Sequence, residues 1–172
     1  MTAARQPVLD FISHSPDQTR GFGALLGRTL DRGSVVLVSG PIGAGKTALI
    51  QGIGHGLGVE TEVRSPTFTL VVEHRAKTAD GQPVNLYHVD FYRIEDGITE
   101  VEDLGFDEYL DDPDSILVIE WPQRARGILP PEYLLVELQH IADTKRRILL
   151  IPHGNRYDHM ARTIRSEVSG GS

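Results

Sequence analysis

The segment from Gly40 to Thr47 constrains the fold of this chain more than any other part of its sequence. It consists of a glycine, four variable residues and then Gly-Lys-Thr, which is the spacing of a phosphate-binding P-loop. Residues 34–39, just before it, form a short apolar run rich in β-branched residues, as expected of a strand buried on both faces of a parallel sheet. Apolar residues then recur at helical spacing to about Gly56. The order of strand, glycine loop and helix therefore predicts a phosphate site at the N-terminus of a helix.

The residue types in this segment suit a nucleotide and a metal ion. Glycines allow backbone N–H groups to turn toward the phosphates, and Lys46 can reach the β- and γ-phosphates. The hydroxyl of Thr47 can bind Mg2+. Only three lysines occur among the 17 basic residues of the chain, so a lysine at this position is informative. We expect the nucleotide to be bound by Gly43, Ala44, Gly45, Lys46, Thr47 and Ala48.

Two acidic residues end hydrophobic runs elsewhere in the chain. Glu120 closes the run 115–120, and Asp90 closes the run 86–90. A carboxylate at the end of a neighbouring strand commonly holds the water shell of the metal in P-loop proteins. We therefore predict that Lys46, Asp90 and Glu120 are catalytic residues. The pattern alone does not separate a metal ligand from a water-orienting base.

Missing motifs narrow the chemistry further. No Asp is followed three residues later by Gly, and no Asn-Lys or Thr-Lys pair is followed by the Asp that selects guanine, so we expect ATP rather than GTP. The chain has no cysteine, which excludes disulfides, thiolate metal sites and a cysteine nucleophile. Its seven histidines lack the H-x-x-x-H or similar spacing of a zinc site. ATP and Mg2+ are thus the predicted cofactors.

Net charge and hydropathy bear on whether the chain binds nucleic acid or a membrane and on the compartment in which we expect it. A formal net charge of −7 argues against a broad nucleic-acid surface, which would need many Lys and Arg contacts to phosphate. No apolar run approaches the ~20 residues of a membrane span, and the N-terminus does not read as a secretory signal. We expect a cytoplasmic protein with no membrane contact.

The pattern of elements predicts an α/β, P-loop NTPase-like fold with three layers and a mixed central sheet. Parallel strands would form the core of the sheet, and antiparallel hairpins would extend it. A Ser-Pro start and helical spacing of apolar residues predict a helix over 15–33. Residues 67–74 and 84–90 are strand-like and flank an Asp-Gly pair, which predicts a hairpin.

The second half of the chain supplies the remaining elements. An acidic segment, 96–110, has the spacing of a helix interrupted by a glycine, and two closing strands are expected at 133–138 and 147–151. We assign residues 1–155 to a single P-loop ATPase domain and 156–172 to a flexible C-terminal tail.

In their order along the chain, these motifs resemble the TsaE family, formerly called YjeE, the P-loop ATPase component of bacterial tRNA threonylcarbamoyladenosine synthesis. The matching segments lie between residues 15 and 151, and their joint order is far more specific than any one of them. Besides the P-loop they are Ser65-Pro66-Thr67-Phe68-Thr69-Leu70-Val71, His88-Val89-Asp90-Phe91-Tyr92-Arg93, Leu104-Gly105 and Glu120-Trp121-Pro122.

The resemblance implies roles for individual residues. Thr47 and Glu120 would be magnesium ligands, and Asp90 would be needed in the nucleotide site. It also implies a switch-like loop over the phosphates, support of the site by the residues after Asp90 and Glu120, and contacts on the base side of the nucleotide. The residues concerned are Ser65, Pro66 and Thr67 for the loop, Trp121 and Arg93 for support, and Thr19 with Arg146 or Arg147 for the base side.

The P-loop departs from the family pattern at two positions. The residue after the first glycine is usually acidic in the family but is Pro41 here, and the next is Ile42 in place of the common leucine. Proline has no backbone N–H to donate. The motif does not fix this position, so we expect phosphate binding to persist without the role of the usual acid.

The resemblance also implies a function. In this family, transfer of a threonylcarbamoyl group onto the adenosine beside the anticodon is carried out by the partner proteins TsaB and TsaD. We expect a weak or partner-stimulated Mg-dependent ATPase that binds the TsaB–TsaD assembly, resets it between turnovers and meets tRNA only through that complex. Two alternatives stay open: a P-loop kinase that phosphorylates a small metabolite, and a nucleotide-gated binding module in which hydrolysis is incidental.

Overall fold

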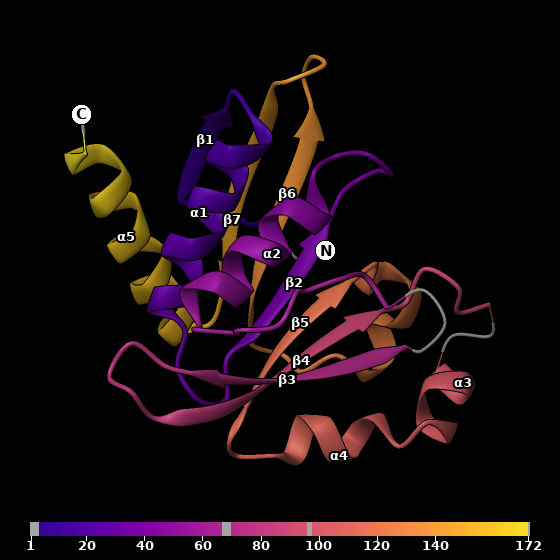
Figure 1. The fold of residues 1–172 in the computed structure, drawn as a ribbon. Coiled ribbons are helices and arrows are strands. Elements are labelled where there is room, and N and C mark those ends of the chain that lie inside the picture. The colour runs from indigo at the N-terminus through magenta and orange to yellow at the C-terminus, as the bar shows by residue number, and fades with distance from the viewer. Residues whose placement is uncertain (1–3, 67–69, 96–97, 172) are drawn as a thin grey trace.

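A seven-stranded sheet forms the centre of the fold in the computed structural model, which describes residues 4–66, 70–95 and 98–171 (Figure 1). The strand order is β1-β7-β6-β2-β5-β4-β3. The strands are β1 (Leu9–Ser13), β2 (Val35–Ser39), β3 (Val71–Lys77), β4 (Pro83–Asp90), β5 (Ser115–Glu120), β6 (Tyr133–His140) and β7 (Arg146–His153). The helices are α1 (Pro16–Thr29), α2 (Lys46–Gly56), α3 (Ile98–Asp103), α4 (Phe106–Asp111), α5 (Asn155–Gly170) and the 3-10 helix η1 (Pro122–Ile128).

The sheet is mixed, as predicted. Strands β4, β5, β2 and β6 run parallel to one another, whereas β3 pairs with β4, β7 with β6 and β1 with β7 in antiparallel fashion. The predicted hairpin is confirmed by β3–β4 for the described residues, since 67–69 lie outside them, and the two predicted closing strands are β6 and β7, which pair antiparallel. The edge strand β1 is an addition that the sequence analysis did not identify.

Two apolar layers cover the sheet, one on each face. Alternate strand residues face opposite sides, so Val36 and Val38 pack with α1, α2 and α5, whereas Val35 and Leu37 pack with α3, α4 and η1. These clusters confirm the three-layer α/β fold (Figure 1). Among the described residues, no helix is both long and apolar enough to cross a bilayer.

Glycines bring α1 and α2 into very close contact. A Cβ atom added to Gly52 would lie 2.1 Å from the Arg20 carbonyl oxygen, and one added to Gly56 would lie 2.2 Å from that of Ala24. On the facing helix, a Cβ at Gly23 would lie 2.2 Å from the Leu49 carbonyl oxygen. Glycine lowers helix propensity, but here it lets the backbone of α1 rest on the helix that follows the P-loop.

The ends of α1 and the acidic helical segment follow the prediction with small differences. Ser15 caps α1 by accepting a hydrogen bond from the Gln18 N–H (3.1 Å), and the Gln18 side chain accepts one from the His14 N–H (2.8 Å), one residue before the usual capping-box partner. The helix ends at Thr29, short of residue 33. The acidic segment forms α3 and α4, separated by Gly105, which adopts a left-handed conformation with φ of 70°.

The expectation of a flexible tail over 156–172 is wrong for the residues that form α5. Tyr157, Met160, Ala161 and Ile164 are buried against the sheet, and the Val35 N–H donates a hydrogen bond to the Tyr157 hydroxyl (2.9 Å). Their spacing along the chain is that of one face of an amphipathic helix. The C-terminal helix is therefore part of the core.

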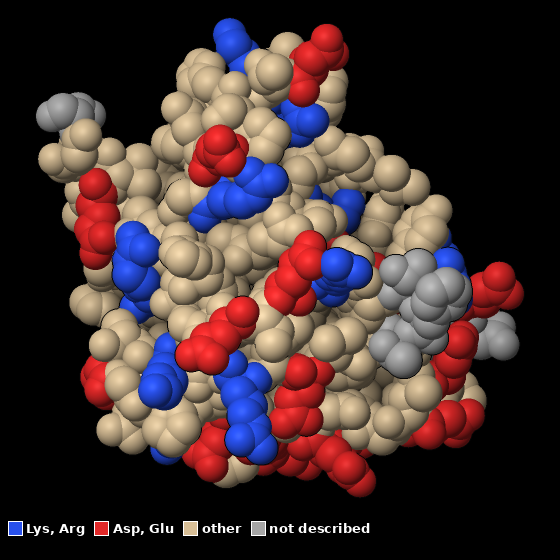
Figure 2. Space-filling model, viewed as in Figure 1, with Lys and Arg blue, Asp and Glu red and all other residues tan. Residues whose placement is uncertain are grey.

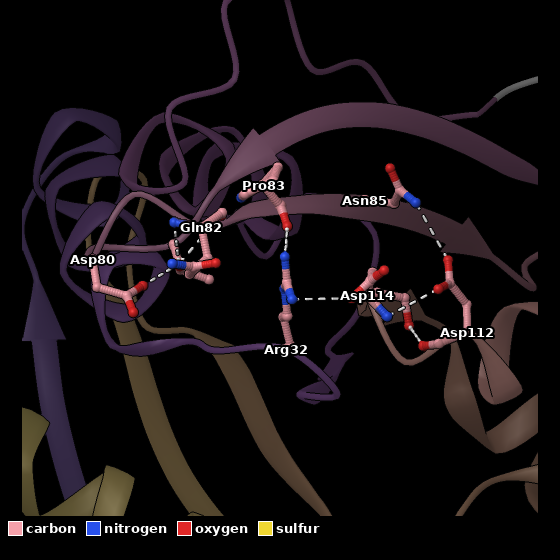
Figure 3. Close-up of polar contacts among 9 residues, drawn as sticks. Arg32, Asp80, Gln82, Pro83, Asn85, Asp112 and Asp114 are labelled. Atoms are coloured by element: carbon pink, nitrogen blue, oxygen red, sulfur yellow. Dashed lines mark hydrogen bonds and ion pairs between the residues drawn. The ribbon is translucent and has the colours of Figure 1, made fainter.

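A polar network joins the amino-terminal ends of neighbouring strands, at the end of the sheet opposite the P-loop (Figure 3). Arg32 forms an ion pair with Asp114 (3.2 Å) and donates a hydrogen bond from Nη2 to the Pro83 carbonyl oxygen (2.8 Å). The amide of Asn85 donates to Asp112 (3.3 Å). These contacts connect the segments that precede β2, β4 and β5, and so help to fix the register with which the same strands reach the P-loop.

Candidate nucleotide-binding site

A pocket of about 600 Å3 opens at the carboxyl ends of β2, β4 and β5, and we refer to it as the P-loop pocket. Its lining comes from the glycine loop and the first turns of α2, the ends of β4 and β5, residue 65 and α1. Residues that were predicted for the site and that line it are Gly43, Gly45, Lys46, Thr47, Ala48, Ser65, Asp90, Glu120 and Trp121. The fold thus brings together most of the predicted set.

The glycine loop has backbone angles that favour glycine. Gly43 and Gly45 have φ values of 79° and 98°, in the left-handed region that other residues rarely adopt. Gly45 is the N-cap of α2, so the loop passes directly into the helix N-terminus. Because the first N–H groups of a helix have no partner within it, this end is suited to bind an anion. Ala44 is fully buried and anchors the loop to the core below.

Lys46 is folded onto its own loop. Its ammonium donates to the carbonyl oxygens of Gly40 (2.6 Å) and Pro41 (2.9 Å) and lies 4.5 Å from the centroid of the Trp121 ring. Burial lowers the pKa of Lys46, and the nearby carboxylates of Glu120 and Asp90 oppose that shift. Pro41, which has no N–H to donate, takes part in this arrangement through its carbonyl oxygen.

Asp90 and Glu120 stand side by side at the ends of adjacent parallel strands. They are register partners of β4 and β5, and Glu120 is buried. Asp90 accepts a hydrogen bond from the Tyr92 N–H (2.9 Å). Burial raises the pKa of Asp90; that hydrogen bond opposes the shift, while the neighbouring Glu120 charge adds to it. Two carboxylates so close together favour a cation between or beside them.

The switch-like segment reaches the pocket at its first residue. Ser65 Oγ lies 3.5 Å from Thr47 Oγ1, so the two hydroxyl groups face one another across the pocket. Pro66 is buried, and Thr67 lies outside the described residues. The placement of Thr67 over the phosphates therefore stays a prediction.

Trp121 has an unusual backbone conformation. Its φ of 55° is the only positive value among the non-glycine residues that the structure describes, and bulky residues adopt this region at a cost of about 1–3 kcal/mol. The ring packs on Tyr92, with ring centroids 5.0 Å apart, and on Lys46. Such strain at a pocket wall is typical of a functional position. Arg93 lies on the exposed turn after β4 and is not part of the pocket lining.

The residues predicted for the base side of the nucleotide, Thr19 with Arg146 or Arg147, lie outside the pocket lining. Thr19 is buried, and its hydroxyl is hydrogen-bonded to Ser13 Oγ (2.7 Å) and the Ser15 carbonyl oxygen (3.3 Å). Arg146 donates to the carbonyl oxygens of Gly43 (3.1 Å) and Ala142 (2.7 Å). In this arrangement Arg146 ties the β6–β7 turn to the glycine loop.

Four residues of the pocket lining were not among the predicted site residues: Ile42 of the glycine loop, Arg20, Gln51 and Tyr92. Arg20 and Gln51 line it together, joined by a 3.3 Å hydrogen bond between α1 and α2, and Tyr92 borders the carboxylates. Gln51 lies four residues after Thr47 and therefore on the same face of the helix, a signal that could have identified it. Arg20 depends on the crossing of α1 over α2, which the sequence does not reveal.

The donor groups fit Mg2+ bound together with a nucleotide. The described residues contain no group of three or more His, Asp or Glu side chains arranged to hold a metal by themselves. Mg2+ usually keeps several waters and takes one or two protein oxygens along with substrate phosphates. The Thr47 hydroxyl and the Glu120 carboxylate are oxygen donors of that kind, and both border the same pocket.

Comparisons with known proteins place the chain in a family. A model of the family described as "Threonylcarbamoyl adenosine biosynthesis protein TsaE" matches residues 13–148. The chain is 37% identical over 144 residues to the tRNA threonylcarbamoyladenosine biosynthesis protein TsaE of Bacillus subtilis, covering 84% of this chain and 85% of that protein. It is 38% identical over 142 residues to the protein of the same name from Streptomyces coelicolor, covering 80% and 93%. The crystal structure of YdiB from Bacillus subtilis matches with a TM-score of 0.73 and 30% identity, over 92% of this chain and 95% of that one.

Proposed function

The chain belongs to the TsaE family of tRNA threonylcarbamoyladenosine biosynthesis proteins, and on that basis we propose that it binds and hydrolyses ATP with Mg2+ in the P-loop pocket in support of this modification. Hydrolysis would reset the assembly of TsaB and TsaD, which carries out the transfer, between turnovers. The chain itself would not transfer the threonylcarbamoyl group.

One observation carries the proposal. The ammonium of Lys46, the hydroxyl of Thr47 and the carboxylates of Asp90 and Glu120 all border one pocket at the N-terminus of α2. The Lys46 ammonium, the glycine loop and the N-terminus of α2 together favour the binding of a chain of phosphates. The paired carboxylates of Asp90 and Glu120 favour the binding of a metal ion beside it. No other described pocket combines these groups.

The residues of the pocket would act in sequence on the nucleotide. Lys46 would leave the carbonyl oxygens of Gly40 and Pro41 for the β- and γ-phosphates, because a charge-assisted bond to phosphate is stronger than one to a carbonyl group. Thr47 and Glu120 would hold Mg2+, which when bound neutralises charge on the phosphates. The raised pKa of Asp90 suits a group that orients the attacking water and accepts its proton, so we assign Asp90 that role.

The charge distribution supports action through partner proteins. Acidic side chains gather along the α3–α4 edge in Figure 2, and on the rest of that face acidic and basic side chains are interspersed. A protein that bound tRNA by itself would need a clustered basic surface. Because the whole chain also carries a formal net charge of −7, we take contact with tRNA to come through the TsaB–TsaD assembly.

A hydrolysis assay with γ-labelled ATP tests the proposal. We expect slow release of inorganic phosphate by the chain alone, a clear rise when TsaB and TsaD are added, and loss of both rates in Glu120→Gln. No rise on addition of the partners would count against the proposed role. A labelled product other than inorganic phosphate would indicate a kinase instead. If Glu120→Gln abolished hydrolysis but left tRNA modification intact, nucleotide-gated binding would replace hydrolysis as the function.

A further inference from the structure

Below the P-loop pocket, His88 makes a hydrogen bond that the proposed chemistry does not use. Its Nε2 lies 2.8 Å from Oε2 of Glu120, and the two side chains are only 1% and 4% exposed. A hydrogen bond this well shielded from water is stronger than one at the surface and restricts the orientation of both groups. The Glu120 side chain is therefore fixed by a hydrogen bond with His88 on the side away from the pocket lining.

The strand register explains why His88 reaches Glu120 but not the nucleotide. Asp90 pairs with Glu120 across β4 and β5, and His88 precedes Asp90 by two residues on the same face of the sheet. Both carboxylates line the pocket, whereas His88 lies outside its lining. The hydrogen bond to Glu120 is the direct contact through which His88 can influence the pocket.

The direction of the hydrogen bond follows from the chemistry of the two groups. A carboxylate oxygen accepts hydrogen bonds, so the His88 tautomer with hydrogen on Nε2 is the one that donates a hydrogen bond to Oε2. This interaction occupies one oxygen of Glu120. The other oxygen, Oε1, is then the one that faces no competition from His88 for a metal ion or its water.

A second histidine lies behind the first. His74 occupies the diagonal position across β3 and β4, because it pairs with Leu86, two residues before His88. Its Nδ1 is 3.2 Å from Thr61 Oγ1, and burial together with the neighbouring His88 lowers its pKa. The described residues contain three buried polar side-chain atoms without a hydrogen-bond partner, and Nδ1 of His88 and Nε2 of His74 are two of them. Apart from Glu120, His88 therefore has no polar side-chain partner that would account for a histidine at this buried position.

We propose that His88 is a positioning residue, which orients the Glu120 carboxylate so that Oε1 is directed to the metal side of the P-loop pocket. This inference rests on the proposed function, since it takes Glu120 to be a magnesium ligand. Partners that orient metal ligands commonly change metal affinity by about 10- to 100-fold when they are removed. Magnesium affinity, rather than nucleotide affinity, is thus the quantity that His88 should control.

The test uses the full chain and a nonhydrolysable ATP analogue in calorimetry, first with EDTA and then across a magnesium titration. His88→Leu removes the donor, and His88→Gln restores an amide N–H near the position of Nε2. His159→Leu, at an exposed position on α5, is the matched control. Mn2+ binding to the nucleotide complex, followed by electron paramagnetic resonance, gives a readout independent of turnover.

We expect His88→Leu to raise the half-saturating magnesium concentration by at least about 10-fold and to weaken Mn2+ binding equally. Analogue affinity in EDTA should stay within about twofold of wild type, and both His88→Gln and His159→Leu should bind magnesium nearly as wild type does. Should His88→Leu fail to fold, His88→Asn replaces it, because its shorter amide cannot reach Glu120 from the Nε2 position and the same loss is expected.

Several results would overturn the inference. Unchanged magnesium affinity in His88→Leu would show that the hydrogen bond does not orient Glu120. Equal losses with magnesium and with EDTA, or no rescue by His88→Gln, would indicate a general structural role. If the wild-type chain itself binds the analogue no better with magnesium, the proposed function fails and this inference fails with it, and that outcome is distinguishable because it does not involve the variants.

Discussion

The ammonium of Lys46 lies 4.5 Å from the centroid of the Trp121 ring while it donates hydrogen bonds to Gly40 and Pro41 of its own loop. The loop thus holds its lysine in a cage of carbonyl oxygens and one aromatic face. A triphosphate would have to draw the ammonium out of this cage. Two predictions follow from the competition between the loop and the phosphates.

Lys46→Ala should weaken ATP binding by about 100-fold, since hydrogen bonds to charged groups contribute about 1.5–3 kcal/mol each. Lys77→Ala, on the exposed end of β3, is the matched control for loss of one positive charge and should bind as wild type does. Isothermal calorimetry measures both. An affinity of Lys46→Ala within about twofold of wild type would contradict the predicted phosphate contact.

ATP should change the fluorescence of Trp121, which is the only tryptophan of the chain. Removal of the Lys46 ammonium from the ring face changes the field around the indole, and the neighbouring Tyr92 keeps the ring in place. A titration of emission intensity and wavelength with ATP checks this. The Lys46→Ala variant should begin with altered emission and respond little, whereas an equal response in both proteins would exclude the lysine as the source.

Asp90→Asn should stabilise the fold near neutral pH while it slows ATP hydrolysis. Burial raises the pKa of Asp90 in the folded state, so ionisation of this carboxyl costs stability above its folded pKa, and the cost disappears as the pH falls below the unfolded value of about 3.9. The melting temperature should rise at pH 7, where about 2–4 °C corresponds to 1 kcal/mol in a chain of this size. The gain should vanish near pH 3.5.

The exposed variant Asp103→Asn provides the reference for this measurement. It should leave the melting temperature unchanged at both pH values, because its side chain lies at the surface of α3. A melting temperature of Asp90→Asn below that of wild type at pH 7 would show that the Asp90 carboxylate stabilises the fold. The view that this carboxylate is kept for function in spite of a cost in stability would then be wrong.

Two glycine substitutions should have opposite effects on stability. Gly52→Ala places a Cβ 2.1 Å from the Arg20 carbonyl oxygen and should destabilise the fold by about 1–3 kcal/mol, because the backbone of α1 cannot move aside without loss of packing. Gly21→Ala, where an added Cβ meets nothing within 4 Å, should stabilise α1 by up to about 1 kcal/mol. Urea unfolding measures both, and equal effects of the two changes would contradict the close crossing of α1 and α2.

Most of the fold and of the candidate site could be predicted from local patterns in the sequence. The glycine loop, the carboxylates that end β4 and β5, and the hairpins each follow from a short stretch with a physical requirement of its own, such as the left-handed φ at Gly45. The contacts of Arg20 and His88 could not be read in this way. They depend on how two elements distant in sequence meet, through the glycine crossing of α1 and α2 and through the β4–β5 register.

The misread regions have different causes. The apolar residues of α5 do have helical spacing, so the signal was present in the sequence and was overlooked among the charged residues between them. Strand β1 has five residues at the sheet edge, too few to separate from an irregular N-terminus by composition. The contact of Thr19 with the base side of the nucleotide stays a prediction; its hydroxyl is hydrogen-bonded to Ser13 and to the Ser15 carbonyl oxygen.

A crystal structure with a nonhydrolysable ATP analogue and Mg2+ tests the central claim most directly. We expect Lys46 Nζ on phosphate oxygens in place of the Gly40 and Pro41 carbonyl groups, and Thr47 Oγ1 on the metal. Glu120 should reach the metal directly or through one water. A nucleotide bound elsewhere, or a metal that neither Thr47 nor Glu120 approaches even through water, would contradict the account.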